Sequence, residues 1–102
     1  MSYKGSDLSN DFKVFFRAEK KRISKALTEL GCTKIEMDYG FYFFSGFFTS
    51  ESGQIYYLMV HIDNRPIEYK QILFRTAKDY KDYTGGSNQY IDKNDLENIR
   101  LK

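Results

Sequence analysis

The stretch GFYFFSGFFTSESGQIYYLMVHID, residues 40–63, decides the fold. It contains two runs of aromatic and β-branched residues on either side of residues 50–53. Such runs are typical of strands, and a short segment of Gly and small polar residues between them suits a hairpin turn. The stretch therefore predicts two antiparallel strands. Gly46, inside the first run, predicts a bulge or a place where something packs closely on the backbone.

The flanking segments predict further strands and a helix. Residues 33–39, TKIEMDY, alternate charged and apolar side chains, as a strand with one face in water does. Residues 67–77, IEYKQILFRTA, supply a fourth strand after the single proline, Pro66. Residues 8–30 carry apolar side chains at helical spacing, and Gly31 suits a left-handed cap at the end of that helix.

The C-terminal part of the chain predicts a loop and a short helix. Residues 77–91 read as irregular or partly helical. The helix is expected over residues 93–101, with Asp92 as N-cap and Asp95 as its capping-box partner. The order of elements predicts an α+β two-layer sandwich: a long N-terminal amphipathic helix, an antiparallel sheet of three to four strands and a short C-terminal helix.

Composition narrows the class of protein. The 102 residues are 41% hydrophobic and 29% charged, as in ordinary globular chains, so neither disorder nor a membrane span is indicated. The formal charge of +2 is too small to imply a polyanionic partner by itself. The single cysteine, Cys32, excludes an internal disulfide and a zinc site built on several cysteines. We expect one cytoplasmic domain over residues 1–102, with no cofactor, metal or membrane contact.

The aromatic side chains predict a surface that needs a cover. Both rows of the second predicted strand are aromatic: Phe41, Phe43 and Phe47 against Tyr42, Phe44 and Phe48. One row packs on the helices. The other is covered by the loop after Ala77, or it binds a partner, which can be a second copy of the chain in a homodimer.

Two groups of residues are candidates for binding. The first is a basic ridge on the predicted N-terminal helix, opposite its apolar stripe: Lys13, Arg17, Lys20 and Lys21. The second lies in residues 75–90, RTAKDYKDYTGGSNQY, where Lys-Asp-Tyr occurs twice: Arg75, Lys78, Tyr80, Lys81 and Tyr83. Interleaved basic and aromatic side chains can hold a nucleic-acid strand, although Asp79 and Asp82 oppose the binding of phosphate. Alternatively, the tyrosines pack onto the aromatic sheet.

Enzymatic chemistry finds weak support in the sequence. Glu68 and Lys70, with Asp63 or Asp38, could mimic the acidic residues and lysine that hold Mg²⁺ in many nucleases. An exposed cross-strand ion pair explains the same residues. Glu19 falls within the apolar stripe of the helix, and a hydrogen bond from a strand tyrosine, or an Arg or Lys reaching over the sheet, explains it better than a catalytic acid does.

The order helix, three strands, helix resembles the double-stranded-RNA-binding domain, in which the first helix and the start of the last one contact RNA. That family carries a lysine-rich turn at the start of a long last helix. Residues 92–100, DKNDLENIR, are acidic and short, so no RNA contact is transferred from the family.

These observations predict a small non-enzymatic binding module. Its expected partner is a nucleic acid or nucleoprotein, contacted by the basic ridge and the Tyr/Lys loop. The first alternative is a protein-binding inhibitor or adaptor, of the kind that phages and mobile elements encode, which uses an aromatic sheet face. The second alternative is a metal-dependent nuclease.

Overall fold

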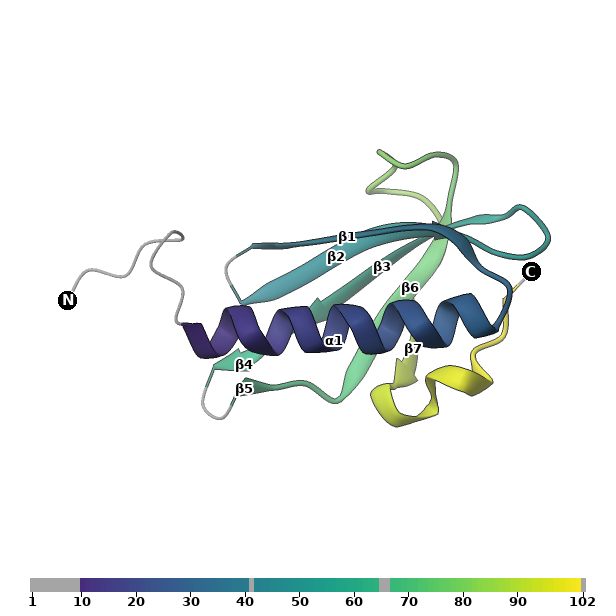
Figure 1. The fold of residues 1–102 in the computed structure, drawn as a ribbon. Coiled ribbons are helices and arrows are strands. Elements are labelled where there is room, and N and C mark those ends of the chain that lie inside the picture. The colour runs from purple at the N-terminus through teal and green to yellow at the C-terminus, as the bar shows by residue number, and fades with distance from the viewer. Residues whose placement is uncertain (1–9, 41, 65–66, 102) are drawn as a thin grey trace.

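The computed structural model describes residues 10–40, 42–64 and 67–101. A long helix, α1 (Asn10–Glu29), lies across one face of an antiparallel sheet, and a short 3-10 helix, η2 (Lys93–Asn98), follows the last strand (Figure 1). The sheet has the strand order β1-β2-β3-β6-β7. These strands are β1 (Thr33–Gly40), β2 (Phe43–Thr49), β3 (Ile55–His61), β6 (Gln71–Ala77) and β7 (Gln89–Asp92). A separate two-stranded sheet joins β4 (Asp63–Asn64) to β5 (Ile67–Glu68).

The α+β class and the predicted hairpin are confirmed. β2 and β3 pair antiparallel from Phe43 opposite His61 to Thr49 opposite Ile55. The prediction of three to four strands is wrong, because β7 adds a fifth strand within a segment expected to be irregular. The sheet therefore also departs from the three strands of the RNA-binding domain that the order of elements resembles.

The segment 67–77 is not one strand. Tyr69 is 2% exposed, and its ring meets the rings of Phe15 and Phe44, on the face of the sheet that α1 covers. Because Tyr69 turns into this core, residues 67–68 pair with β4, and the main sheet resumes at Gln71.

Two predicted helix caps are confirmed, whereas the predicted capping-box partner Asp95 instead accepts a hydrogen bond from the Asn98 side chain at 3.4 Å. At the end of α1, Gly31 has a φ of +88°, and the Cys32 N–H donates to the Leu27 carbonyl at 2.9 Å, which is the pattern of a Schellman cap. The predicted N-cap of the last helix is confirmed, since the Asp92 carboxylate accepts from the Asn94 N–H at 2.8 Å. This helix is a 3-10 helix that ends at Asn98, earlier than the predicted residue 101.

The main core lies between α1 and the face of the sheet that we call the first face. Alternate positions from Tyr56 to Ile62 are the more apolar ones in the sequence and predict one buried row in the third strand. The row is confirmed in β3, because Tyr56, Leu58 and Val60 are each at most 2% exposed. They pack in one cluster with side chains of α1, β2 and β6: Phe12, Phe16, Ile23, Leu27, Phe44, Phe48, Ile72 and Phe74. Within the described residues, no helix is long and apolar enough to cross a membrane.

Gly46 marks a close approach between two strands, as predicted. A Cβ atom placed on Gly46 would lie 1.7 Å from the carbonyl oxygen of Glu36 in β1. The pairing of β1 with β2 is irregular between Thr33 and Glu36, and Lys34 has a φ of +52° there. The absence of a side chain at position 46 thus lets β1 lie close to β2, and this close approach determines the position of Glu36.

Candidate binding surface on the second face of the sheet

The second face of the sheet, away from α1, carries its own small apolar cluster. Phe47, Tyr57 and Ala77 are buried in it. Half-buried neighbours pack against them: Ile55, Met59, Leu73 and Tyr80. The cover of this cluster comes from the loop 78–88, which leaves the sheet on the side opposite α1 (Figure 1).

Tyr80 fixes the loop to the sheet. Its ring centroid lies 5.5 Å from that of Phe47. Its hydroxyl donates to the Lys34 carbonyl at 2.7 Å and lies 2.7 Å from the hydroxyl of Thr49. Tyr83 follows, with its ring centroid 5.4 Å from that of Phe47. The alternative that the loop tyrosines pack onto the aromatic sheet is therefore confirmed for both residues.

The two loop aspartates hold the backbone of the loop. Asp82 accepts from the N–H groups of Lys78 at 2.9 Å and Thr84 at 3.0 Å. These backbone hydrogen bonds, with that of Lys78 the strongest, lower the pKa of Asp82. Asp79 accepts from the Lys81 N–H at 2.7 Å. The aspartates of the repeated Lys-Asp-Tyr tripeptide thus hold the loop backbone in its conformation. The lysine side chains of the repeat are exposed.

Arg75 also holds the loop in place. Its guanidinium carbon lies 4.6 Å from the centroid of the Tyr57 ring. It donates to the Asn88 side chain at 3.0 Å and to the carbonyl oxygen of Tyr83. Arg75 and Tyr80, predicted as contacts for a partner, are therefore engaged within the protein, while Tyr83 remains 59% exposed.

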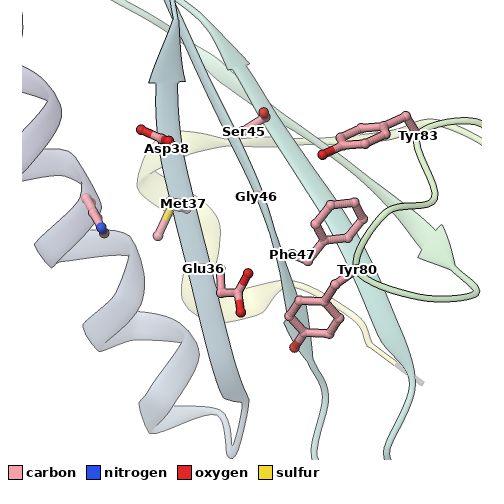
Figure 2. Close-up of a pocket in the computed structure, with 9 residues that line it drawn as sticks. Glu36, Met37, Asp38, Ser45, Gly46, Phe47, Tyr80 and Tyr83 are labelled. Carbon is pink, nitrogen blue, oxygen red and sulfur yellow. The ribbon is translucent and has the colours of Figure 1, made fainter.

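The predicted basic ridge lies on a different side of the molecule from the loop. Arg17, Lys20 and Lys21 are exposed on α1, and Lys13 is half-buried. The two predicted groups approach each other at the β1 edge, where one cavity of about 490 Å³ is lined by Lys20 and by Tyr80 and Tyr83. Two carboxylates of β1, Glu36 and Asp38, line the same cavity (Figure 2). Negative charge therefore separates the ridge from the loop, and it opposes a continuous phosphate-binding surface.

The other end of the second face is open. A cavity of about 410 Å³ lies there, and its walls include Met59, His61, Leu73 and Tyr90. Tyr90 is opposite Leu73 in the pairing of β7 with β6, so its side chain is on the second face. Tyr90 is 58% exposed. The sequence did not single out Tyr90, because its position depends on the pairing of β7, a strand of four residues.

Two large aromatic side chains of this face are exposed. Among the described residues, four such side chains are exposed: Val14 at 59%, Tyr39 at 37%, Tyr83 at 59% and Tyr90 at 58%. The two most exposed aromatic residues, Tyr83 and Tyr90, both lie on the second face. They stand at its covered end and at its open end, respectively.

Glu19 has a tyrosine partner, as predicted, but this tyrosine lies between β5 and β6 and not in a strand. The Tyr69 hydroxyl donates to the Glu19 carboxylate at 2.5 Å, and Arg22 donates to the same oxygen at 2.9 Å. Burial raises the pKa of Glu19, but the hydrogen bonds from Arg22 and Tyr69 outweigh burial and leave the pKa below its ordinary value. Burial and the bond to Glu19 raise the pKa of Tyr69. This cluster joins α1 to the segment after β5 and has a structural role.

The residues of the nuclease hypothesis are partly brought together. Asp63 of β4 is directly opposite Glu68 of β5, and Asp63 lines the open-end cavity with Lys70. Asp38 belongs to β1, at the edge of the main sheet. In the parts of the chain that the structure describes, no three His, Cys, Asp or Glu side chains are grouped so that they could hold a metal ion. Cys32 is buried, and burial raises the pKa of its thiol.

No known protein family model matches the chain, and neither does any curated protein or solved structure.

Proposed function

We propose that this protein is a small non-enzymatic module that binds another protein through the second face of its sheet, as an inhibitor or an adaptor. The observation that carries the proposal is the position of Tyr83 and Tyr90, the two most exposed aromatic side chains among the described residues, at the two ends of that face. Tyrosine is enriched at protein interfaces because it offers a large contact area and a hydroxyl at a low cost in conformational entropy.

The loop supports the proposal because it is held in place. Tyr80 ties it to β1 and β2, and Arg75 ties it to the Tyr57 ring and the Tyr83 carbonyl. A surface that is already ordered loses little entropy when it binds, and this increases affinity. Tyr83 is therefore presented to a partner by a fixed frame.

A matched set of variants tests this proposal. Tyr83→Ala combined with Tyr90→Ala removes both exposed rings, whereas Val14→Ala removes an equally exposed hydrophobic side chain from α1. In affinity purification from the native host, we expect the double variant to lose its specific protein partner and the Val14 variant to retain it. If the double variant retains the partner as well as the wild type does, the second face is not the interface.

Nucleic-acid binding by the basic ridge is a second candidate. Within the described residues, one ion pair is formed, between Arg22 and Glu19, so Arg17, Lys20 and Lys21 make no direct ion pair there. Binding of this kind depends steeply on salt concentration, because bound lysines and arginines release counterions from the nucleic acid.

A gel-shift series at increasing salt tests the second candidate. Lys20→Glu with Lys21→Glu reverses two charges on an exposed helix surface and is expected to abolish the shift. Absence of any shift by the wild type at low ionic strength would eliminate nucleic acid as a partner.

A further inference from the structure

Glu36 is an exposed carboxylate beside an aromatic surface. It is directly opposite Phe47 in the pairing of β1 with β2, so both side chains are on the second face. It forms no ion pair with any residue that the structure describes. Together with Tyr80, it lines two neighbouring cavities of about 490 and 570 Å³ along β1. An unneutralised charge at this place is available to a ligand.

Aromatic rings form another wall of the first cavity. The rings of Tyr80 and Tyr83 both contact that of Phe47, with centroids 5.5 and 5.4 Å apart. Figure 2 shows the Glu36 carboxylate on the side of β1 that faces Phe47 and Tyr80. The faces of aromatic rings attract cations, and a carboxylate strengthens this attraction. The chemistry of the cavity therefore selects an organic cation.

A guanidinium group is already bound on the same face. Arg75 lies over the Tyr57 ring, with its guanidinium carbon 4.6 Å from the ring centroid, and donates to the Tyr83 carbonyl oxygen. Because a guanidinium is planar, it can stack on a ring and also donate two parallel hydrogen bonds to a carboxylate. An ammonium group is attracted to a ring face but cannot stack on it, and it pairs with a carboxylate as a point charge without the two parallel hydrogen bonds.

We propose that the cavity between β1 and the loop binds an arginine side chain of the partner protein. Glu36 accepts the hydrogen bonds of the guanidinium, and the rings of Tyr80 and Tyr83 contact its faces. This inference rests on the proposed function, because it names the group that the partner presents at the covered end of the second face.

Lys20 lines the same cavity and therefore provides a further prediction. Its ammonium lies 5.9 Å from the centroid of the Phe16 ring on α1. Glu36 and Asp38 together outweigh this single positive charge, so the cavity has a net negative charge. Replacement of Lys20 by glutamine is therefore expected to strengthen the binding of a cation. The nucleic-acid candidate predicts the reverse for its own ligand.

The test is an NMR titration of the full chain with N-acetyl-arginine methylamide. The matched control ligand is the citrulline analogue, which has nearly the same shape and no charge. We expect saturable shifts at Glu36, Phe47, Tyr80 and Tyr83 with a dissociation constant of about 1–10 mM, as for a single side chain. Citrulline should produce no saturable shift, and the lysine analogue should bind about threefold or more weakly.

Variants complete the test. Glu36→Gln is expected to weaken arginine binding about tenfold, as for the loss of one charge-assisted pair. Glu29→Gln, which removes an exposed carboxylate at the end of α1, should leave binding unchanged, and Lys20→Gln should tighten it. Equal shifts with arginine and citrulline, equal affinity for lysine, or equal effects of the two glutamate variants would each overturn the inference.

Failure here is distinguishable from failure of the proposed function. If the partner is lost with the Tyr83 and Tyr90 variants but arginine does not bind, the second face is the interface and the arginine assignment is wrong. If those variants retain the partner, the interface itself is elsewhere and the arginine assignment falls with it.

Discussion

Two carboxylates beside aromatic rings, those of Glu19 and Glu36, differ in the partners that they have within the protein. Glu19, on the helix α1 that covers the first face, accepts hydrogen bonds from Tyr69 and Arg22 and is held within the fold. Glu36, on the second face, lies opposite Phe47 and forms no ion pair with the described residues. The polar groups of the first face are used to join α1 to the sheet. On the second face, Tyr80 and Arg75 are also engaged within the fold, and Glu36 is the carboxylate that we propose meets a ligand.

The covers of the two faces differ in the same way. The first face is closed by α1, and ten large side chains of the core that α1, η2 and the sheet form together are less than 2% exposed. The second face is covered at one end by the loop 78–88, while Tyr90 and a cavity mark the other end. Stability therefore resides mainly in the first face, and the binding that we propose is assigned to the second.

The largest effect on stability is expected from core truncation. Phe44→Ala on the first face should lower the free energy of unfolding by about 3–5 kcal/mol, because it leaves a cavity in a closed core. Phe47→Ala on the second face should cost less, about 2 kcal/mol, because the loop above it can settle into the space. Urea unfolding measures both. Equal losses would contradict a difference between the two faces.

Gly46→Ala should be nearly as damaging as the loss of Phe44. The new methyl group would meet the Glu36 carbonyl at 1.7 Å, so β1 must move away from β2. We expect a loss of about 3 kcal/mol in the free energy of unfolding. Because the movement displaces Glu36, the variant should also lose arginine binding in the NMR titration. Gly53→Ala, in the hairpin turn, provides the comparison of backbone strain without a clash, because Gly53 has a φ of +94° and no heavy atom lies within 4 Å of the added methyl group.

Glu19→Gln tests the satisfied carboxylate through the dependence of stability on pH. The pKa of Glu19 in the folded protein is below its ordinary value of 4.5, so the ionised carboxylate stabilises the fold at neutral pH. This contribution is lost as the pH falls from about 4.5 through the lower, folded-state pKa. We expect the variant to be about 1–2 kcal/mol less stable at pH 7.

Below the folded-state pKa of Glu19, the difference between wild type and Glu19→Gln should shrink. Thermal unfolding between pH 3 and 7 measures it, and Glu36→Gln serves as the matched control with little effect on stability. A constant difference over the whole range would mean that the charge of Glu19 does not stabilise the fold.

The smallest of these effects is expected from Tyr80→Phe. This change keeps the ring on Phe47 and removes the hydroxyl that contacts Lys34 and Thr49. We expect a loss of about 1 kcal/mol, the usual contribution of a hydrogen bond, together with faster amide exchange across the loop 78–88. Unchanged exchange in the loop would show that the hydroxyl does not hold it.

Much of the fold could be predicted from local sequence, but the strand β7 and the break at Tyr69 could not. The Gly31 cap, the hairpin and the apolar row of β3 depend on neighbouring residues, so they could be predicted. β7 is four residues long and contains one aliphatic side chain, Ile91, so local periodicity could not reveal it. The break at Tyr69 depends on a contact with α1, which is distant in the sequence.

For the same reason, only part of the candidate site could be predicted. The repeated tripeptide pointed to Tyr80 and Tyr83. The contacts of Tyr80 and Arg75 with the sheet could not be predicted, because they depend on the position of the loop over the sheet. Alternation in β1 placed Glu36 on the charged side of that strand. Its proximity to Phe47 required the register of β1 with β2, which the irregularity near Lys34 shifts.

The most direct test of the central claim is photo-crosslinking at single sites in the native host. A photoreactive phenylalanine replaces Tyr90 on the second face or Val14 on α1, two side chains of nearly equal exposure. We predict a discrete protein adduct at position 90 that resists nuclease treatment and does not form at position 14. An adduct at position 14 alone, or one at position 90 that nuclease removes, would contradict the assignment of the second face as a protein-binding surface.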